Sequence, residues 1–295
     1  MTEDVQLENS RRLLHEFALR PPEFTSKPQD QDRDKHDDSI YACMSCMLED
    51  DSCEGVHHGY SQNPDGTYVI AVETEFGEEC SGEMFDWWFC FADDTKKYLW
   101  WHPKDHVSAT WNKEYFDVRV RDRKAGHYIG NRHCVDEKID GITKSLEISF
   151  VHPSEFFGND YAKDFVKAKV TSCVTGYVYS REGFPLPGLI RIGVLVHMVK
   201  RYEKEGEKKN VLFSRFYLGK VKKSNKDYPF SAPLVNYVGN TFLYRNLQLT
   251  QDVVHGLFRH CAEEMAILGK MLPQLYLQEV NSTNKNSNEG GLLIA

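Results

Sequence analysis

The chain of 295 residues lacks several features that mark common protein classes. It has no run of 18 apolar residues, so no transmembrane helix is expected, and its polar, acidic first ten residues do not resemble a signal peptide. It has neither a Gly-rich phosphate loop nor the Gly-x-Ser-x-Gly motif of serine α/β-hydrolases. Basic charge is also scarce, because the net charge is −8. The sequence therefore predicts a cytoplasmic protein without a nucleic-acid or membrane partner.

Cysteine is used without an evident disulfide framework. Five of the eight cysteines sit singly and are interpreted as reduced thiols: Cys80, Cys90, Cys134, Cys173 and Cys261. The other three include a Cys-x-x-Cys pair, Cys43 and Cys46. With Cys53 and the His57-His58 pair they form a candidate zinc knuckle. No second well-spaced pair follows, so this structural zinc site is the weaker of the metal hypotheses for the chain.

Aromatic residues make up 13% of the chain, and all five tryptophans lie between Met84 and Trp111. Met84 to Phe91 predicts a short buried helix. The polar segment His102-Pro103-Lys104-Asp105-His106 follows as a turn between apolar flanks. Two histidines and an aspartate beside tryptophans are a plausible source of metal ligands, and equally a set of hydrogen-bonded structural residues.

Alternating hydrophobicity predicts several antiparallel strands before the C-terminal region. Clear runs are Thr67–Phe76, His133–Ile139, Lys144–Val151, Ile190–Lys200 and Val211–Val221, whereas Val174–Tyr179 fits either a strand or a helix end. Asp140-Gly141 predicts a hairpin turn, and Glu203–Lys209 a charged hairpin loop. The strand face that carries Val135 and Ile139 should turn inward. Glu137 shares that face, so its carboxylate needs a buried partner.

Leu249 to Leu277 predicts one long amphipathic helix, capped by Thr250 and ending near Pro273. Its apolar face holds Val253, Leu257, Ile267, Leu268 and Met271, while Gln251, His255, Arg259 and Glu263 are predicted to lie away from it. His260 and Glu264 break the pattern, because they sit at i and i+4 inside the apolar stripe. Either a metal ion or a buried arginine would satisfy Glu264.

Antiparallel strands followed by one long helix predict an α+β grip, with a cavity between sheet and helix. In that fold Glu137 would face His260 and Glu264. Such mixed ligands suit Zn²⁺, with Mn²⁺ or Fe²⁺ as possibilities, and the His102–His106 loop can supply a fourth ligand. We expect an N-terminal helical and loop extension over residues 1–60, with a helix near Glu8–Leu19. A helix-grip catalytic domain would span 61–280, and a disordered tail 281–295.

Together these motifs resemble the 2,4-diacetylphloroglucinol hydrolases, a group that includes the phloretin hydrolases. The resemblance covers roughly residues 80 to 277 and rests on the MFDWWF segment, the Trp-His-Pro-x-Asp-His motif, the Glu137 strand and the C-terminal His-x-x-x-Glu. It implies a curved antiparallel sheet around a C-terminal helix, as in the Bet v 1 group. It also implies a zinc ion and the hydrolysis of a carbon–carbon bond between an acyl group and a phloroglucinol ring.

Carried over by motif, the resemblance implies zinc ligation by four residues: His106, Glu137, His260 and Glu264. It implies that Tyr98, His197 and Tyr217 act on the substrate. The two tyrosines would favour the keto tautomer of the ring, and His197, with an ordinary pKa near 6.5, would shuttle a proton. His102 and Asp105 are better suited to orienting a ligand than to binding the metal.

Two substrates fit the resemblance equally well: 2,4-diacetylphloroglucinol, giving monoacetylphloroglucinol and acetate, and phloretin, giving phloroglucinol and an aryl propionate. A different class of function stays open, namely a carrier of hydrophobic ligands, in which Glu137, His260 and Glu264 form a metal-free buried network. The long apolar strands would also allow a homodimer.

Overall fold

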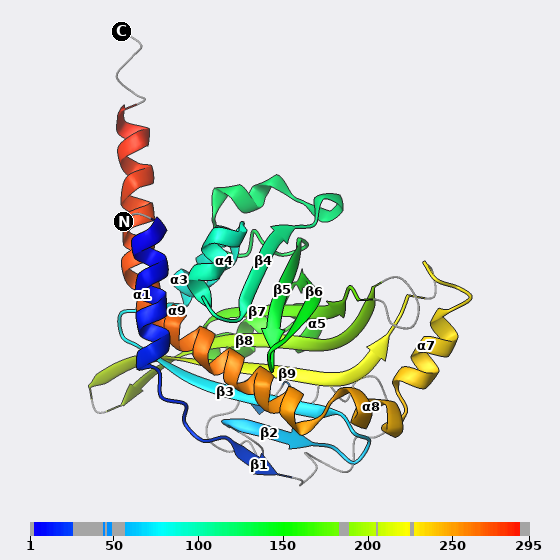
Figure 1. The fold of residues 1–295 in the computed structure, drawn as a ribbon. Coiled ribbons are helices and arrows are strands. Elements are labelled where there is room, and N and C mark those ends of the chain that lie inside the picture. Colours follow the sequence, from blue (N-terminus) through cyan, green and yellow to red (C-terminus); the bar gives the residue numbers. More distant parts are fainter. Residues whose placement is uncertain are drawn as a thin grey trace.

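The computed structural model describes residues 3–25, 44, 46–48, 57–182, 189–204, 206–224 and 227–289. Within this part a nine-stranded sheet has the order β1-β2-β3-β9-β8-β7-β6-β5-β4 (Figure 1). Neighbouring strands are antiparallel, except that β1 runs parallel to β2. The strands are β1 (Glu23–Thr25), β2 (Gly59–Gln62), β3 (Tyr68–Gly77), β4 (His106–Trp111), β5 (Arg132–Ile139), β6 (Ile142–Val151), β7 (Val170–Ser180), β8 (Ile190–Lys204) and β9 (Glu207–Lys222).

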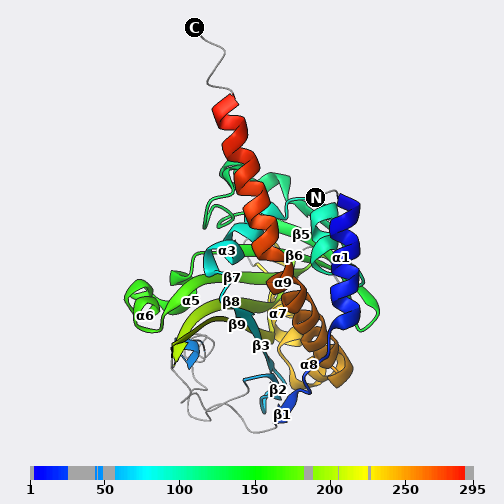
Figure 2. The same ribbon diagram turned by 90° about the vertical axis from the view of Figure 1, so that its left-hand side faces the viewer.

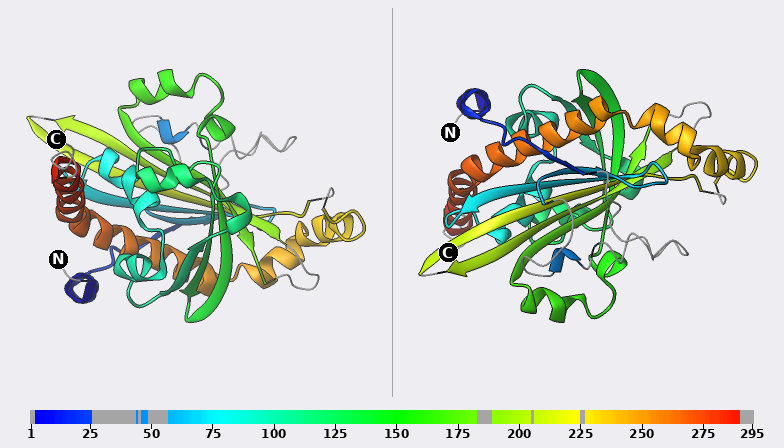
Figure 3. Two further views of the ribbon diagram at one scale, coloured as in Figure 1. Left: turned by 90° about the horizontal axis from the view of Figure 1, so that it is seen from above. Right: turned by 90° about the horizontal axis from the view of Figure 1, so that it is seen from below.

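The long helix α9 (Gln251–Glu289) crosses one face of this curved sheet, and α1 (Glu3–Glu16) lies beside it (Figures 1 and 2). Near α1 are α3 (Gly82–Phe91) and α4 (Thr95–Trp101), while α7 (Ala232–Gly239) and α8 (Phe242–Gln248) precede α9. The opposite face carries α5 (Ser154–Phe157) and α6 (Tyr161–Lys167) (Figure 3). Three short 3₁₀ segments complete the described elements: Cys46–Leu48, Lys113–Tyr115 and Val118–Asp122.

A curved antiparallel sheet that wraps one long C-terminal helix is the helix-grip, Bet v 1-like fold, so the predicted fold class is confirmed. Two apolar clusters flank the sheet. The larger one lies between sheet and α9 and includes Trp88, Leu195 and Phe258. The smaller one lies under α5 and includes Phe156 and Tyr217. Alternate residues of β8 and β9 therefore belong to different cores.

The C-terminal helix is longer than its sequence pattern predicted. Thr250 caps it as expected, since its Oγ1 accepts from the Val253 N–H at 3.4 Å. Pro273 does not end it, although a proline removes one helical hydrogen bond and crowds the preceding turn. Leu272 and Leu275 are buried on either side and hold the helix against the core. The helix continues to Glu289, through part of the predicted tail, and residues 290–295 lie outside the described residues.

The boundaries of other helices and strands also differ from those predicted from the sequence. The N-terminal helix covers Glu3–Glu16 rather than residues 8–19, and Val174–Tyr179 belongs to strand β7. The charged loop predicted over residues 203–209 is mostly strand, since Glu203 and Lys208 are paired across the hairpin and opposite charges stabilise such pairs. Strand β1 joins the sheet through β2, so part of the segment before residue 60 is built into the same sheet. None of the described helices is long and apolar enough to cross a membrane.

Candidate metal centre

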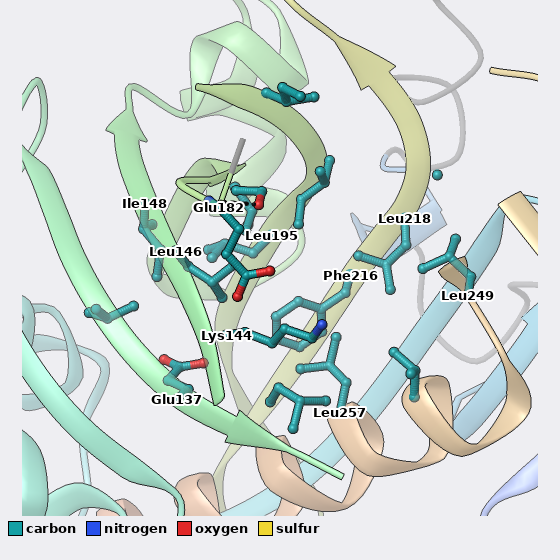
Figure 4. Close-up of a pocket in the computed structure, with 18 of the residues that line it drawn as sticks. Glu137, Lys144, Leu146, Ile148, Glu182, Leu195, Phe216, Leu218, Leu249 and Leu257 are labelled. Atoms are coloured by element: carbon teal, nitrogen blue, oxygen red, sulfur yellow. Dashed lines mark hydrogen bonds between the residues drawn. The ribbon is translucent and has the colours of Figure 1, made fainter. Parts of the chain in front are cut away.

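A cavity of about 380 Å³ lies between the sheet and α9. Most of its lining is apolar, and Figure 4 shows leucines of β6, β8, β9 and α9 pointing into it. Glu137 projects from β5 into the same space. His260 and Glu264 of α9 also line the cavity. Charged side chains in an apolar wall are costly unless they are paired, so this part of the wall requires an explanation.

The four predicted ligands come together in this wall. His106 Nε2 lies 3.4 Å from Glu264 Oε2, and His260 Nε2 lies 3.7 Å from Glu137 Oε2 and 3.9 Å from Glu264 Oε2. Donor atoms of His106, Glu137 and His260 all fall within 4.8 Å of one another. The cluster is buried, with each of the four residues no more than 8% exposed.

Strand pairing and one close backbone contact create this convergence. His106 begins β4 and lies directly opposite Glu137 of β5 in the sheet register. The β5–β6 turn then approaches α9 at Gly256, one helical turn before His260. A Cβ at Gly256 would lie 2.9 Å from the Cβ of Asp140 and 3.0 Å from its backbone nitrogen. Only glycine lets the turn come this close, and the contact brings Glu137 over His260.

Tyr98 orients two of the cluster residues at once. The His106 Nδ1–H donates to the Tyr98 carbonyl at 2.8 Å, and the two rings stack with centroids 3.7 Å apart. The Tyr98 hydroxyl donates to Glu137 Oε1. Because Nδ1 of His106 carries the proton, its Nε2 presents a lone pair to the cluster, and no hydrogen bond reaches that atom from any described residue. This is the arrangement of a metal-binding imidazole.

His260 is oriented in a similar way by Asp105. Its Nδ1 lies 3.5 Å from Asp105 Oδ2, which leaves Nε2 to face Glu137 and Glu264. Asp105 in turn lies 3.4 Å from Arg259 Nη2. The prediction that Asp105 positions a ligand fits this geometry.

His102 supports the cluster from outside. It is close enough to Asp105 and His260 to form a second possible ligand group. Both of its ring nitrogens are already engaged, however: Nδ1 accepts from the Asp105 N–H at 2.9 Å, so Nε2 carries the proton and donates to Glu263 at 3.0 Å. His102 therefore has no lone pair left for a metal ion. The sequence pattern placed Glu263 away from the core, but it is only 8% exposed, because His102 donates a hydrogen bond to it and Arg259 neutralises its charge.

The electrostatics of the cluster favour protons on Glu264 and His260, the positions that a metal ion would take over. Burial raises the pKa of Glu264 to about 8, because burial, together with the charges of Glu137 and Asp105, outweighs the opposing charge of His260. Burial opposes charge on His260, but the nearby Asp105 carboxylate and the charges of Glu264 and Glu137 raise its pKa to about 9. Among the described residues no arginine or lysine forms an ion pair with Glu264. The buried-arginine alternative therefore does not apply to this residue.

The residues present fit a metal ion. Two carboxylates and two oriented imidazoles converge, and at least one imidazole nitrogen has no other partner. A bound cation would replace the proton on Glu264 and satisfy both carboxylates. The buried His and carboxylate cluster can therefore bind a metal. The Cys43, Cys46 and Cys53 alternative lies outside the residues whose side chains the structure describes.

The three predicted substrate residues have different outcomes in the structure. Tyr98 and His197 line the cavity. The Nδ1 atom of His197 is hydrogen-bonded to Ser214 Oγ at 2.8 Å. Burial lowers the pKa of His197 to about 3, so the ordinary pKa near 6.5, on which the prediction of a proton shuttle rested, does not apply. Tyr217 belongs to the cluster on the other face of the sheet, with Val69 and Val196. Neighbouring strand residues point to opposite faces, and Phe216 faces the cavity instead, which contradicts the prediction for Tyr217.

The fold and the site together define a helix-grip protein with a ligand cavity and a candidate metal centre in its wall. The sequence profile described as "DAPG hydrolase PhiG domain" matches residues 43–277, and the chain belongs to this family. A curated relative is the phloretin hydrolase of Eubacterium ramulus, which is 24% identical over 236 residues, or 79% of this chain and 76% of that protein. The family resemblance predicted from sequence is therefore confirmed.

Solved structures with related architecture are similar at low identity. Ara h 8.0201 is 11% identical over 68% of this chain and 98% of its own, with a TM-score of 0.28. Ginseng major latex-like protein 151 from Panax ginseng is 16% identical over 66% of this chain and 97% of its own, with a TM-score of 0.28. A START superfamily protein from Mycobacterium smegmatis is 11% identical over 65% of this chain and 95% of its own, with a TM-score of 0.26.

Proposed function

We propose that this protein is a zinc-dependent hydrolase that cleaves the carbon–carbon bond between an acyl group and a phloroglucinol-type ring. The family and its phloretin hydrolase relative support the reaction class. The observation that carries the proposal is the convergence of His106, Glu137 and His260, with Glu264 beside them, in the wall of an apolar cavity. The cavity volume of about 380 Å³ lies in the range of sites for small molecules.

Two imidazoles and two carboxylates form a ligand set that suits Zn²⁺. His106, Glu137, His260 and Glu264 would hold the ion, and their neighbours Tyr98 and Asp105 would keep them oriented. When bound, zinc lowers the pKa of a coordinated water to about 7 and polarises a carbonyl group. Because Glu137, His260 and Glu264 line the cavity, a substrate there would meet the metal directly.

The chain's own residues would then bind the ring and favour its keto tautomer. An aryl carbon leaves poorly, but the keto tautomer of a phloroglucinol ring makes the acyl group part of a β-diketone, whose ring carbon departs as an enolate. That carbon must gain a proton, which the attacking water supplies overall. Burial, the charge of Glu137 and the hydrogen bond to it raise the pKa of Tyr98 well above its usual value. Tyr98 stays protonated and is too weak an acid to donate to carbon, so we assign it to hydrogen-bond a ring oxygen and favour the keto tautomer.

His197 has a more limited role in this proposal. It is neutral at pH 7, because burial lowers its pKa to about 3. A neutral imidazole offers a hydrogen bond and not a positive charge. His197 would therefore orient a ring oxygen from the β8 wall, while Phe85, Phe89 and Phe216 pack around it. Either acetylated phloroglucinols or phloretin can be the substrate.

Metal content and turnover test the proposal together. Plasma mass spectrometry of the wild-type protein, purified without chelator, should find about one zinc per chain, the stoichiometry of a four-ligand site. Glu264→Ala should hold much less. The zinc-loaded wild type should then release acetate from 2,4-diacetylphloroglucinol or an aryl propionate from phloretin. A metal-free wild type that binds these ketones without cleaving them would favour a ligand carrier and refute the hydrolase.

A further inference from the structure

His133 is a buried polar residue of the cavity to which the proposed reaction gives no role. It lies on β5 on the same face as Val135 and Glu137, and it lines the cavity. Only 7% of it is exposed. Its Nε2 is fully buried and receives no hydrogen bond from any residue that the structure describes. A buried nitrogen without a partner is rare in folded proteins, and it marks a place where a ligand atom can bind.

Aromatic contacts hold the imidazole in place. Trp111 lies opposite His133 in the β4–β5 register, and the two rings stack with centroids 4.5 Å apart. Tyr98 meets the same imidazole edge-on at 5.9 Å. The ring plane is therefore set by packing, while Nε2 has no hydrogen-bond partner among the described residues. A buried polar group without a partner raises the free energy of the unliganded protein, because it has lost its hydrogen bonds to water. A ligand that hydrogen-bonds to the group recovers part of this free energy.

The imidazole differs from the other unpaired groups nearby. The indole N–H groups of Trp88 and Trp101 also lack partners among the described residues, but an indole can only donate. Burial lowers the pKa of His133 to about 4, so the ring is neutral at pH 7. A neutral imidazole has one donor and one acceptor, which matches a phenol or its keto tautomer.

The position of His133 indicates which substrate atom it contacts. Tyr98 lies between the metal cluster and His133, since its ring stacks on His106 and touches His133 at its edge. An aromatic ketone with its carbonyl at the cluster would extend its ring along Tyr98. The ring oxygen opposite the acyl group would then come closest to His133.

We propose that His133 determines specificity for the aromatic ring, by hydrogen-bonding the hydroxyl or keto oxygen para to the acyl group. This inference rests on the proposed function, because it assumes an acylphloroglucinol in the cavity. It assigns His133 a recognition role that is distinct from metal binding and from proton transfer.

A pair of ligands isolates the para oxygen. 2,4,6-Trihydroxyacetophenone has it, and 2,6-dihydroxyacetophenone lacks it. Dissociation constants are measured on the zinc-loaded protein by quenching of tryptophan fluorescence immediately after mixing. The wild type should bind the trihydroxy compound about fivefold to tenfold more tightly, the range that one hydrogen bond supplies. His133→Phe keeps the stacked ring but removes both nitrogens, so its ratio should fall to about one while its affinity for the dihydroxy compound changes little.

Two further variants control for packing. His58 is also buried, with an unpaired Nε2 and an edge-on contact to Phe258, but it is not among the residues that line the cavity. His58→Phe should retain the wild-type ratio. His133→Gln restores an N–H and a carbonyl, and should recover part of the preference for the trihydroxy compound. Thermal melting of each variant establishes that it is folded.

The inference is overturned if His133→Phe keeps the wild-type preference, if His58→Phe loses it equally, or if the wild type binds neither compound. Failure of the proposed function gives a different result. A zinc-loaded wild type that binds both compounds but cleaves no acylphloroglucinol would refute the hydrolase. The binding ratio would still decide the role of His133.

Discussion

Helix α9 carries two adjacent i, i+4 pairs that look alike in sequence and behave differently in the structure. Arg259 and Glu263 form direct hydrogen bonds of 3.0 Å, and Glu263 also accepts from His102. His260 and Glu264 remain 3.9 Å apart, and within the described part of the chain the ion-pair partners of Glu264 are the histidines His106 and His260. The first pair is balanced by its own neighbours. The second pair is buried and oriented but holds protons that a bound cation would displace, which is the state expected of residues that bind a metal ion.

The difference follows from what surrounds each pair. Hydrogen bonds and charges from His102 and Arg259 overcome burial and lower the pKa of Glu263. Burial and the charge of Glu137 raise the pKa of Glu264 to about 8. One helix therefore holds a carboxylate that is stable when charged and, one residue later, a carboxylate that needs either a proton or a metal ion. The comparison separates a structural network from a functional one.

Replacing His260 with alanine should have the largest effect, and replacing its neighbour His102 provides the comparison. His260→Ala removes a ligand, so zinc retained after dialysis should fall from about one per chain to under about a tenth. Turnover should fall on the order of a thousandfold, because metal ions contribute several kcal/mol to such reactions. His102→Ala removes only an outer contact, and should retain most of its zinc in the same dialysis. Equal zinc content in both variants would contradict the distinction between the networks.

Breaking the balanced pair should have an intermediate effect. Arg259→Met removes the basic partner of Glu263 and of Asp105, while its alkyl chain keeps the packing. Asp105 would then orient His260 less firmly. Zinc affinity, measured by competition with a fluorescent chelator, should fall about 10-fold to 100-fold, as is typical of outer-shell changes. Glu8→Gln, on the exposed end of α1, serves as a charge control and should leave the affinity unchanged.

The smallest effect concerns the stability of the metal-free protein. Glu264 has a pKa of about 8 in the folded chain and an ordinary value of 4.5 when unfolded, so the folded state binds more protons between these values. Its contribution to the free energy of unfolding therefore falls as pH rises through this window. Burial lowers the pKa of His133 and His197 and gives the opposite slope below pH 6.5. The difference between wild type and Glu264→Gln reports the carboxyl together with its effect on the pKa of His260.

Urea unfolding of both chelator-treated proteins between pH 5 and 8 provides the measurement. The wild type should lose stability relative to Glu264→Gln as pH rises. Zinc should reverse this trend, because the cation replaces the proton. Parallel pH profiles for the two metal-free proteins would show that Glu264 is already balanced, as Glu263 is.

Much of the fold could be predicted from local pattern. Strict alternation placed Glu137 inward on β5, and helical periodicity placed His260 and Glu264 on the buried face of α9. The same patterns failed where a partner from another element decides the outcome. Glu263 lies on the flank of the helix, and only the approach of His102 and Arg259 explains its burial. Tyr217 was assigned by motif, but a one-residue difference along a strand moves a side chain to the other face.

By itself, the sequence determined the fold class and the family, and it marked the buried polar residues that needed partners, because periodicity and composition are local properties of a chain. Tertiary structure alone decided which partners they met. The β4–β5 register sets His106 opposite Glu137, and Gly256 lets the β5–β6 turn reach α9. The unpaired nitrogen of His133 likewise appears only in three dimensions. Whether a buried polar atom is satisfied depends on contacts between residues far apart in the chain, and no local pattern encodes those distances.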